Sequence, residues 1–429
     1  MGLPFGYSKC TRGGGGEAPK CYEWWNIQNL EPPRVAAPEQ VTAASGNLMG
    51  IIRQPGAQAQ PVMHPASGVT PKPQALAPAF GRYLGSVADG VHSGSGRTRA
   101  NDDHTDYYPV PLKEETLRPG TTYADPYGHL LVIVRRVAQS EDAAGVFLAV
   151  DGQPDGTVAR KRFWRGNFLF AQDPALGGPG FKHFRPIVRT NGGTLRRLTN
   201  DEIAKNPQYA DFSLEQSQLA IEDFYDRMDD LMSPQPLDPL RAMKEAITSL
   251  EEQVKMRVTS VENGRKWQTN GRGDAEMPNG AAIFETTGAW EDFATPARDL
   301  RLLIAIDVVR NFPDRVTRRP ERYAMPKGKS VADVKAELEG VLASELATRK
   351  FSYSLSDGSP WTLALKDVID RMPDLEMAYN LNDCVELRWG APEKSQEAAT
   401  CRRHAPSVQR AKMTQYRAWF HERRRPPRA

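Results

Sequence analysis

The chain has 429 residues, enough for more than one hydrophobic core, because single cores stop growing at about 250–300 residues. Its 56 Lys and Arg against 53 Asp and Glu leave a net charge of +3, too balanced for a protein whose main role is to bind nucleic acid. The longest apolar runs, residues 130–134 and 302–306, are far shorter than the ~18 residues of a membrane-spanning helix.

The sequence of residues 1–110 predicts a loop-rich N-terminal segment that packs on the core of the protein. Prolines recur through residues 32–80 without helical or strand periodicity, which favours an extended loop. The start of the chain lacks the basic and apolar regions of a signal peptide, so the chain as written is expected in the cytoplasm. The acidic and histidine-containing stretch 101–108 has the spacing of neither a calcium loop nor a zinc site, and we expect no metal and no cofactor.

The four cysteines form two local pairs, Cys10 with Cys21 and Cys384 with Cys401. Neither pair has the two-residue spacing of a zinc or redox motif. A disulfide that closes a loop of this length would stabilise the fold by roughly 3 kcal/mol, and it would form only in an oxidising compartment. If the disulfides form, we expect a periplasmic or secreted protein.

The central part predicts strands and the later part predicts helices. Residues 129–137, 146–151, 157–163 and 183–188 favour a small antiparallel sheet or barrel within 111–195. Residues 200–429 predict a mainly helical accessory domain, with helix starts at Ser213, Asp238, Thr295, Ser330, Ser359 and Pro406. The fold class is therefore expected to be α+β.

His129 is the residue on which the functional interpretation depends. The turn of residues 125–128 places it directly before the strand-like run 130–134. A strand fixes an imidazole, and the imidazole pKa lies closest to neutrality, so this position suits a general base. Antiparallel pairing would bring Asp151 or its neighbour Gln153 beside the ring, where either could orient it.

Three motifs follow one another along the chain. They are Gly-Leu-Pro-Phe-Gly-Tyr at 2–7, Leu-Arg-Pro-Gly-Thr at 117–121, and His129 opening the strand Leu-Leu-Val-Ile-Val before Asp151. The order of these motifs resembles that of NlpC-type cell-wall peptidases, a circularly permuted branch of the papain-like cysteine enzymes. The resemblance covers residues 1–7 and 112–170, and Thr121 stands where the family has Asp. It implies a papain-like sheet, His129 as the base and Asp151 as its orienting residue.

The nucleophile implied by the resemblance is a cysteine that opens a helix before Gly2, so we expect this chain to begin downstream of it. Within the chain, Cys21 is the candidate, because residues 22–30 favour a helix whose N-terminus would lower the thiol pKa. The alternative for Cys21 is a disulfide with Cys10.

The expected function is cysteine-dependent hydrolysis of an amide bond in a cell-wall-type peptide, with His129, Asp151 and Cys21 as catalytic residues. One alternative is a non-catalytic envelope binding or scaffold protein that retains a peptidase-like sheet. Another is a transglutaminase-like acyl transferase, which uses the same residues and accepts an amine in place of water. The expected partner is a peptide or peptidoglycan-type substrate, and the sequence does not indicate an oligomeric state.

Overall fold

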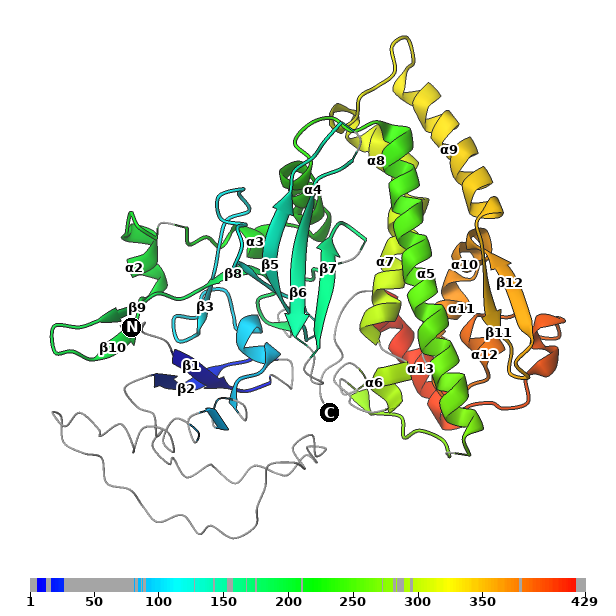
Figure 1. The fold of residues 1–429 in the computed structure, drawn as a ribbon, viewed down its shortest axis with the longest axis horizontal. Coiled ribbons are helices and arrows are strands. Elements are labelled where there is room, and N and C mark those ends of the chain that lie inside the picture. The colour runs from blue at the N-terminus through cyan, green and yellow to red at the C-terminus, as the bar shows by residue number, and fades with distance from the viewer. Residues whose placement is uncertain are drawn as a thin grey trace, which may run out of the picture.

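A computed structural model gives the fold (Figure 1). It describes residues 6–12, 17–26, 81, 84–85, 87, 90–126, 128–141, 143–152, 157–166, 168–173, 176–209, 211–271, 273–280, 283, 289–293, 296–377 and 380–421. The extended loop predicted for residues 32–80 and the basic tail lie outside these ranges. Within the described ranges, no helix combines the length and apolar character needed to cross a bilayer.

Mixed α+β structure is confirmed. The largest sheet in the described ranges has six antiparallel strands in the order β3-β8-β4-β5-β6-β7. Their bounds are β3 Tyr107–Pro109, β4 Thr122–Ala124, β5 Leu130–Val137, β6 Val146–Gly152, β7 Val158–Phe163 and β8 Gly180–Phe184. The sheet is open, because its edge strands β3 and β7 do not pair with each other in the described part of the chain, so the barrel alternative is wrong.

The remaining strands form three antiparallel hairpins. They are β1 Gly6–Cys10 with β2 Cys21–Asn26, β9 Ile187–Arg189 with β10 Leu195–Arg197, and β11 Lys350–Ser354 with β12 Pro360–Ala364. Two helix predictions were wrong here. Residues after Cys21 form strand β2, since Tyr22, Trp24 and Trp25 are aromatic residues that favour strands. The helix expected from Ser359 begins only at Leu365, after β12.

The helices carry most of the later half of the chain. They are α2 Asn200–Lys205, α3 Glu215–Gln218, α4 Ile221–Met232, α5 Pro239–Thr269, α6 Ala289–Phe293, α7 Pro296–Arg310, α8 Phe312–Arg318, α9 Val331–Thr348, α10 Leu365–Asp370, α11 Met372–Met377, α12 Val385–Arg388 and α13 Ser407–His421. Short 3-10 helices are η1 Ser93–Arg97, η4 Pro320–Arg322 and η5 Glu397–Thr400.

The predicted starts of α5 and α9 are confirmed by their caps. The Asp238 side chain accepts a hydrogen bond from Arg241 N, and Ser330 forms a capping box with Asp333. The capping box predicted at Ser213 does not form, because α3 is only four residues long and begins after Leu214 without a side-chain cap. The buried apolar residues that follow, Phe224, Tyr225, Met228 and Met232, belong to the next helix, α4.

Two hydrophobic cores are present. The sheet core takes its buried side chains from residues 108–232, whereas the second core is built mainly from α5 to α13. In the sheet core, Phe224 of α4 stacks on Phe170, with ring centroids 3.7 Å apart. The sheet core therefore extends beyond the boundary expected near residue 195, because α4 packs on the sheet.

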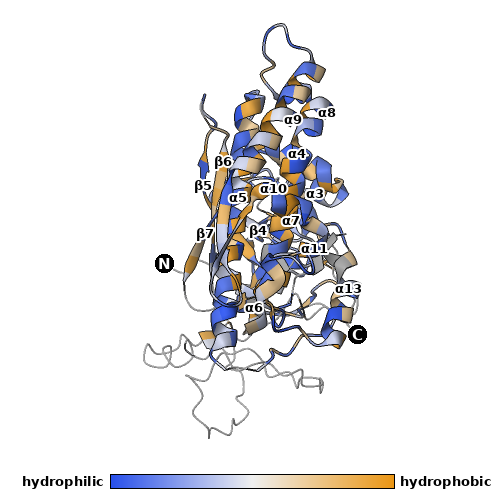
Figure 2. Ribbon diagram, turned by 90° about the vertical axis from the view of Figure 1, so that its right-hand side faces the viewer, coloured by the Kyte–Doolittle hydropathy of each residue, from blue (hydrophilic) through white to orange (hydrophobic). Residues whose placement is uncertain are grey.

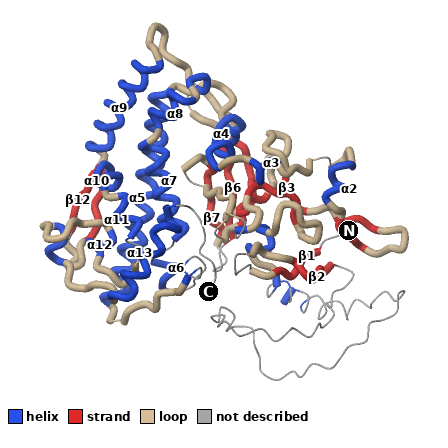
Figure 3. The backbone as a smooth tube through the Cα atoms, turned by 180° about the vertical axis from the view of Figure 1, so that it is seen from behind, coloured by secondary structure: helices blue, strands red, loops and turns tan. Residues whose placement is uncertain are grey.

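The figures show the same division. The six-stranded sheet lies on one side of the molecule, and α5, α7, α9 and α13 lie on the other together with the hairpin β11–β12, with α4 near α8 between the two sides (Figures 1 and 3). Strand β6 is coloured mainly as hydrophobic, while α5 alternates between hydrophilic and hydrophobic segments (Figure 2). The burial of β6 alternates, as in a strand with one face on the core, and α5 has the pattern of an amphipathic helix.

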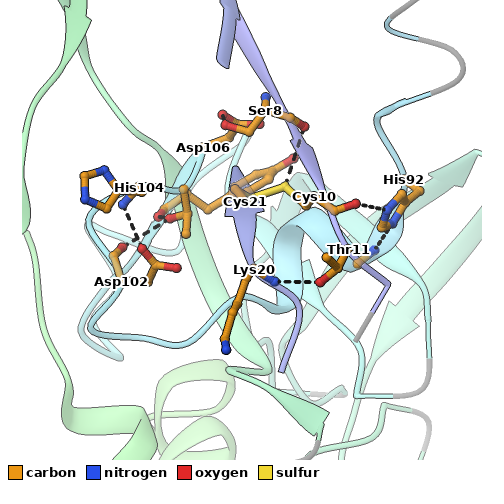
Figure 4. Close-up of a disulfide and its surroundings, with 12 residues drawn as sticks. Ser8, Cys10, Thr11, Lys20, Cys21, His92, Asp102, His104 and Asp106 are labelled. Atoms are coloured by element: carbon orange, nitrogen blue, oxygen red, sulfur yellow. Dashed lines mark hydrogen bonds between the residues drawn. A yellow bond between two sulfur atoms is a disulfide. The ribbon is translucent and has the colours of Figure 1, made fainter. Parts of the chain in front are cut away.

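The β1–β2 hairpin is held against η1 by a neutral histidine, His92. The ring Nε2 lies 2.9 Å from the carbonyl oxygen of Cys10, and Nδ1 accepts a hydrogen bond from Gly94 N (Figure 4). Because a carbonyl only accepts, the hydrogen is on Nε2. Burial of the ring lowers the pKa of His92. The hydrogen bond to the Cys10 carbonyl raises this pKa, and the positive charges of Arg12 and Arg97 lower it further.

We therefore predict that stability falls in mild acid. The contribution of His92 is present in full above its unfolded pKa of about 6.5, and it is lost as the pH falls through the lower folded value. The melting temperature of the wild type should decrease between pH 7 and pH 5 more than that of His92→Asn, whose amide does not titrate. His104→Asn, at an exposed position, should behave like the wild type. Equal pH dependence in wild type and His92→Asn would contradict this assignment.

Candidate functional site

A tight turn places His129 at the start of β5. Asp125 N donates a hydrogen bond to the His129 carbonyl oxygen at 2.9 Å, closing a loop of five residues. Gly128 has a φ of 137°, a conformation that glycine adopts without a steric penalty. The backbone around the imidazole is thereby fixed on both sides, by the turn and by the strand.

Buried arginines from two other elements hold this turn. Arg301 of α7 approaches the fully buried carboxylate of Asp125 at 3.4 Å. Arg97 of η1 donates a hydrogen bond to the carbonyl oxygen of Pro126 at 3.3 Å. The helical core and η1 therefore both contact the turn that carries His129.

The register of the sheet brings His129 and Asp151 together. Val132 pairs with Val150, so Leu131 lies opposite Asp151. His129 is two residues before Leu131, on the same face of the sheet, and is therefore the diagonal neighbour of Asp151. The two side chains meet, with His129 Nδ1 at 2.7 Å from Asp151 Oδ2. In Figure 1, β5 begins and β6 ends at the same end of the sheet.

The pair combines a buried carboxylate with a partly accessible ring. The side chain of Asp151 is 4% exposed and that of His129 is 32% exposed. Because an ionised carboxylate only accepts, the hydrogen between them is carried by Nδ1 of the ring. Nε2 is then the unprotonated nitrogen, and it has no hydrogen-bond partner among the described residues. This arrangement can remove a proton from a group placed at Nε2.

The structure corrects the expectation for Cys21. Cys10 and Cys21 are directly paired across β1 and β2 and form a disulfide (Figure 4). Cys21 thus begins strand β2 and does not open a helix, and its sulfur is bonded. All four cysteines lie in the described ranges, and Cys384 is bonded to Cys401, so no free thiol is present. Gln153, the neighbouring choice to Asp151, lies outside the described residues.

Groups that could ligate a metal have other partners. Cys384, Glu386 and Cys401 lie close together, but both sulfurs are in the disulfide. In the acidic stretch 101–108, Asp102 Oδ1 accepts a hydrogen bond from His104 N, and Asp106 accepts from Ser8 N. These contacts are those of a self-capping turn and of a hairpin anchor (Figure 4).

No family model, curated protein or solved structure matches the chain. The geometry of His129 and Asp151 is therefore the main indication of function. Sequence reasoning missed Arg97 and Arg301, the two residues that hold the turn. The one available signal for Arg301 was a lone cation between Leu300 and an apolar run, since a charged residue there needs a buried partner.

Proposed function

We propose that the protein is a papain-like amide hydrolase in which His129 is the general base and Asp151 orients it. The contact between Nδ1 and the buried carboxylate at 2.7 Å is the observation that carries this proposal. Such a contact keeps the hydrogen on Nδ1 and leaves Nε2 to accept a proton. The papain-like character of the sheet is part of the proposal, supported by a histidine at the start of a strand and its polar neighbour on the next strand.

The chemistry requires a thiol next to Nε2. His129 takes the thiol proton, and the thiolate attacks the amide carbonyl carbon. The tetrahedral intermediate expels the amine, which receives the proton from the imidazolium, and a thioester remains. Water, activated by the same ring, then cleaves the thioester to a carboxylate and restores the thiol. An amine in place of water would make the protein an acyl transferase, the further alternative.

The source of the thiol follows from the disulfides. With both disulfides formed, none of the four cysteines offers the thiol that this reaction needs, and no described contact joins Cys10 or Cys21 to His129. The expectation that the nucleophile precedes Gly2 stays a prediction. The substrate we propose is a cell-wall-type peptide in an oxidising compartment, supported only by the family resemblance and by the disulfides.

The disulfides also favour a second candidate, a non-catalytic envelope binding protein. In that protein, all four sulfurs would have a structural role, and His129 and Asp151 would contact a bound peptide without cleaving it. Binding of a peptide without cleavage, under both oxidising and reducing conditions, would favour this candidate.

We predict that His129→Ala lowers the rate of amide cleavage by ~10²–10⁴-fold, as is typical for loss of a general base. The assay is release of new amino groups from cell-wall-type peptides, with and without reductant. His104→Ala is the matched control, because His104 is exposed and its ring has no role in the proposal. An active wild type with an equally active His129→Ala variant would exclude His129 as the base.

A further inference from the structure

Two neighbouring cavities lie where α4 meets the helical core. One has a volume of about 160 Å³ and the other about 210 Å³. A water molecule needs only about 10–15 Å³ on this measure, so each cavity has room for a small molecule. Arg165, Val308 and Arg315 line both cavities. Figures 1 and 3 show α4 close to α8, the helix that carries Arg315.

Arg315 differs from the other arginines of these cavities. Arg165 pairs with three carboxylates, Arg318 pairs with Asp226, and Arg319 and Arg322 share Asp230. The guanidinium of Arg315 instead lies over the ring of Phe312, 4.7 Å from its centroid.

Among the described residues, the side chain of Arg315 has no hydrogen bond or ion pair. Its Nε is buried without a hydrogen-bond partner, and no carboxylate of the described residues pairs with the guanidinium. A planar guanidinium fixed by an aromatic ring is preorganised to bind a carboxylate through two parallel hydrogen bonds. The cavity beside it therefore presents an unused anion-binding group.

The charged and apolar residues that line the smaller cavity indicate which class of ligand it can bind. Its charged lining consists of four arginines, Arg165, Arg315, Arg319 and Arg322, and three acids, Asp226, Asp229 and Glu245. Arg165, Arg319 and Arg322 are already paired with acids, so Arg315 alone is left for a ligand. A single unpaired cation suits a monoanion, whereas a dianion would be repelled by the acids. Met232, Leu237, Ala242 and Phe312 add apolar surface. We propose that this cavity binds a small monocarboxylate with a short apolar tail, recognised by Arg315.

The proposal is independent of amide hydrolysis and is tested by calorimetry on the full chain. Titration with sodium acetate and sodium butyrate, against sodium chloride at matched ionic strength, should give saturable binding that is tighter for butyrate. Arg315→Ala should weaken this binding at least about tenfold, because a charged hydrogen-bond donor is lost. Arg402→Ala removes an exposed cation elsewhere and should bind like the wild type.

A second variant separates binding from folding. Ala242→Phe fills the cavity without removing an arginine, and it should abolish binding while the far-ultraviolet circular dichroism stays that of the wild type. Absence of saturable binding to both carboxylates would overturn the proposal. Equal binding by Arg315→Ala, or tighter binding of inorganic phosphate than of butyrate, would do so as well.

Discussion

Replacing Asp151 with asparagine is expected to lower the rate of amide cleavage by ~10²–10⁴-fold while the fold is retained. The carboxylate accepts the hydrogen on Nδ1 of His129 at 2.7 Å. An asparagine amide can instead donate to Nδ1, which moves the ring hydrogen to Nε2 and removes the base. The side chain at 151 is buried, so the loss is expected at the chemical step, in kcat, more than in KM.

The control for this variant is Asp201→Asn. Asp201 is an exposed carboxylate paired with Lys205, so its loss removes the same charge from the surface. The measurements are the rate of peptide cleavage and the circular dichroism spectrum. Full activity in a folded Asp151→Asn variant would show that Asp151 does not orient the base.

The largest expected effect on stability comes from Arg165→Met. Arg165 is buried, and its guanidinium pairs with Asp229 at 2.9 Å, with Glu222 at 2.8 Å and with Asp226. Burial alone would lower its pKa, but the carboxylates outweigh burial and raise it above the usual value. Removing one side of a buried ion pair typically costs about 3–5 kcal/mol.

We expect the lower end of that range, about 3 kcal/mol, because Glu222 is largely exposed and Asp226 keeps Arg318. The measurement is the free energy of unfolding in urea. Arg162→Met on β7 is the matched control, since its pair with Glu252 is exposed and should contribute less than about 1 kcal/mol. Equal losses in the two variants would show that the ion pairs of Arg165 do not hold α4 to the sheet.

Local signals in the sequence were sufficient for the elements around the candidate site. Short strand-like runs bounded by turn residues predicted β5, β6 and β7 nearly to the residue, and Asp238 and Ser330 marked true helix starts. The contact of His129 with Asp151 could be anticipated because antiparallel pairing of consecutive strands places the start of β5 beside the end of β6. The contacts that fix the site, from Arg97 and Arg301, join distant segments, and only the lone cation at Arg301 beside an apolar run gave a local signal.

The wrong predictions share a physical cause. Cys21 precedes residues that could form a helix or a strand in isolation, and pairing with β1 decided the outcome. The boundary expected near residue 195 followed the change from strand-like to helical sequence. Side-chain packing, such as that of Phe224 against the sheet, determines which helices belong to the sheet core, and no local periodicity reports it.

The central claim is that His129 is a base oriented by Asp151, and ¹⁵N NMR of the histidine ring tests it without a substrate. The His129 signals are assigned by their absence in His129→Ala. In the neutral ring, we expect protonated Nδ1 and unprotonated Nε2 in the wild type, and the reverse in Asp151→Asn. A wild-type ring with its hydrogen on Nε2, or a tautomer unaffected by Asp151→Asn, would contradict the claim.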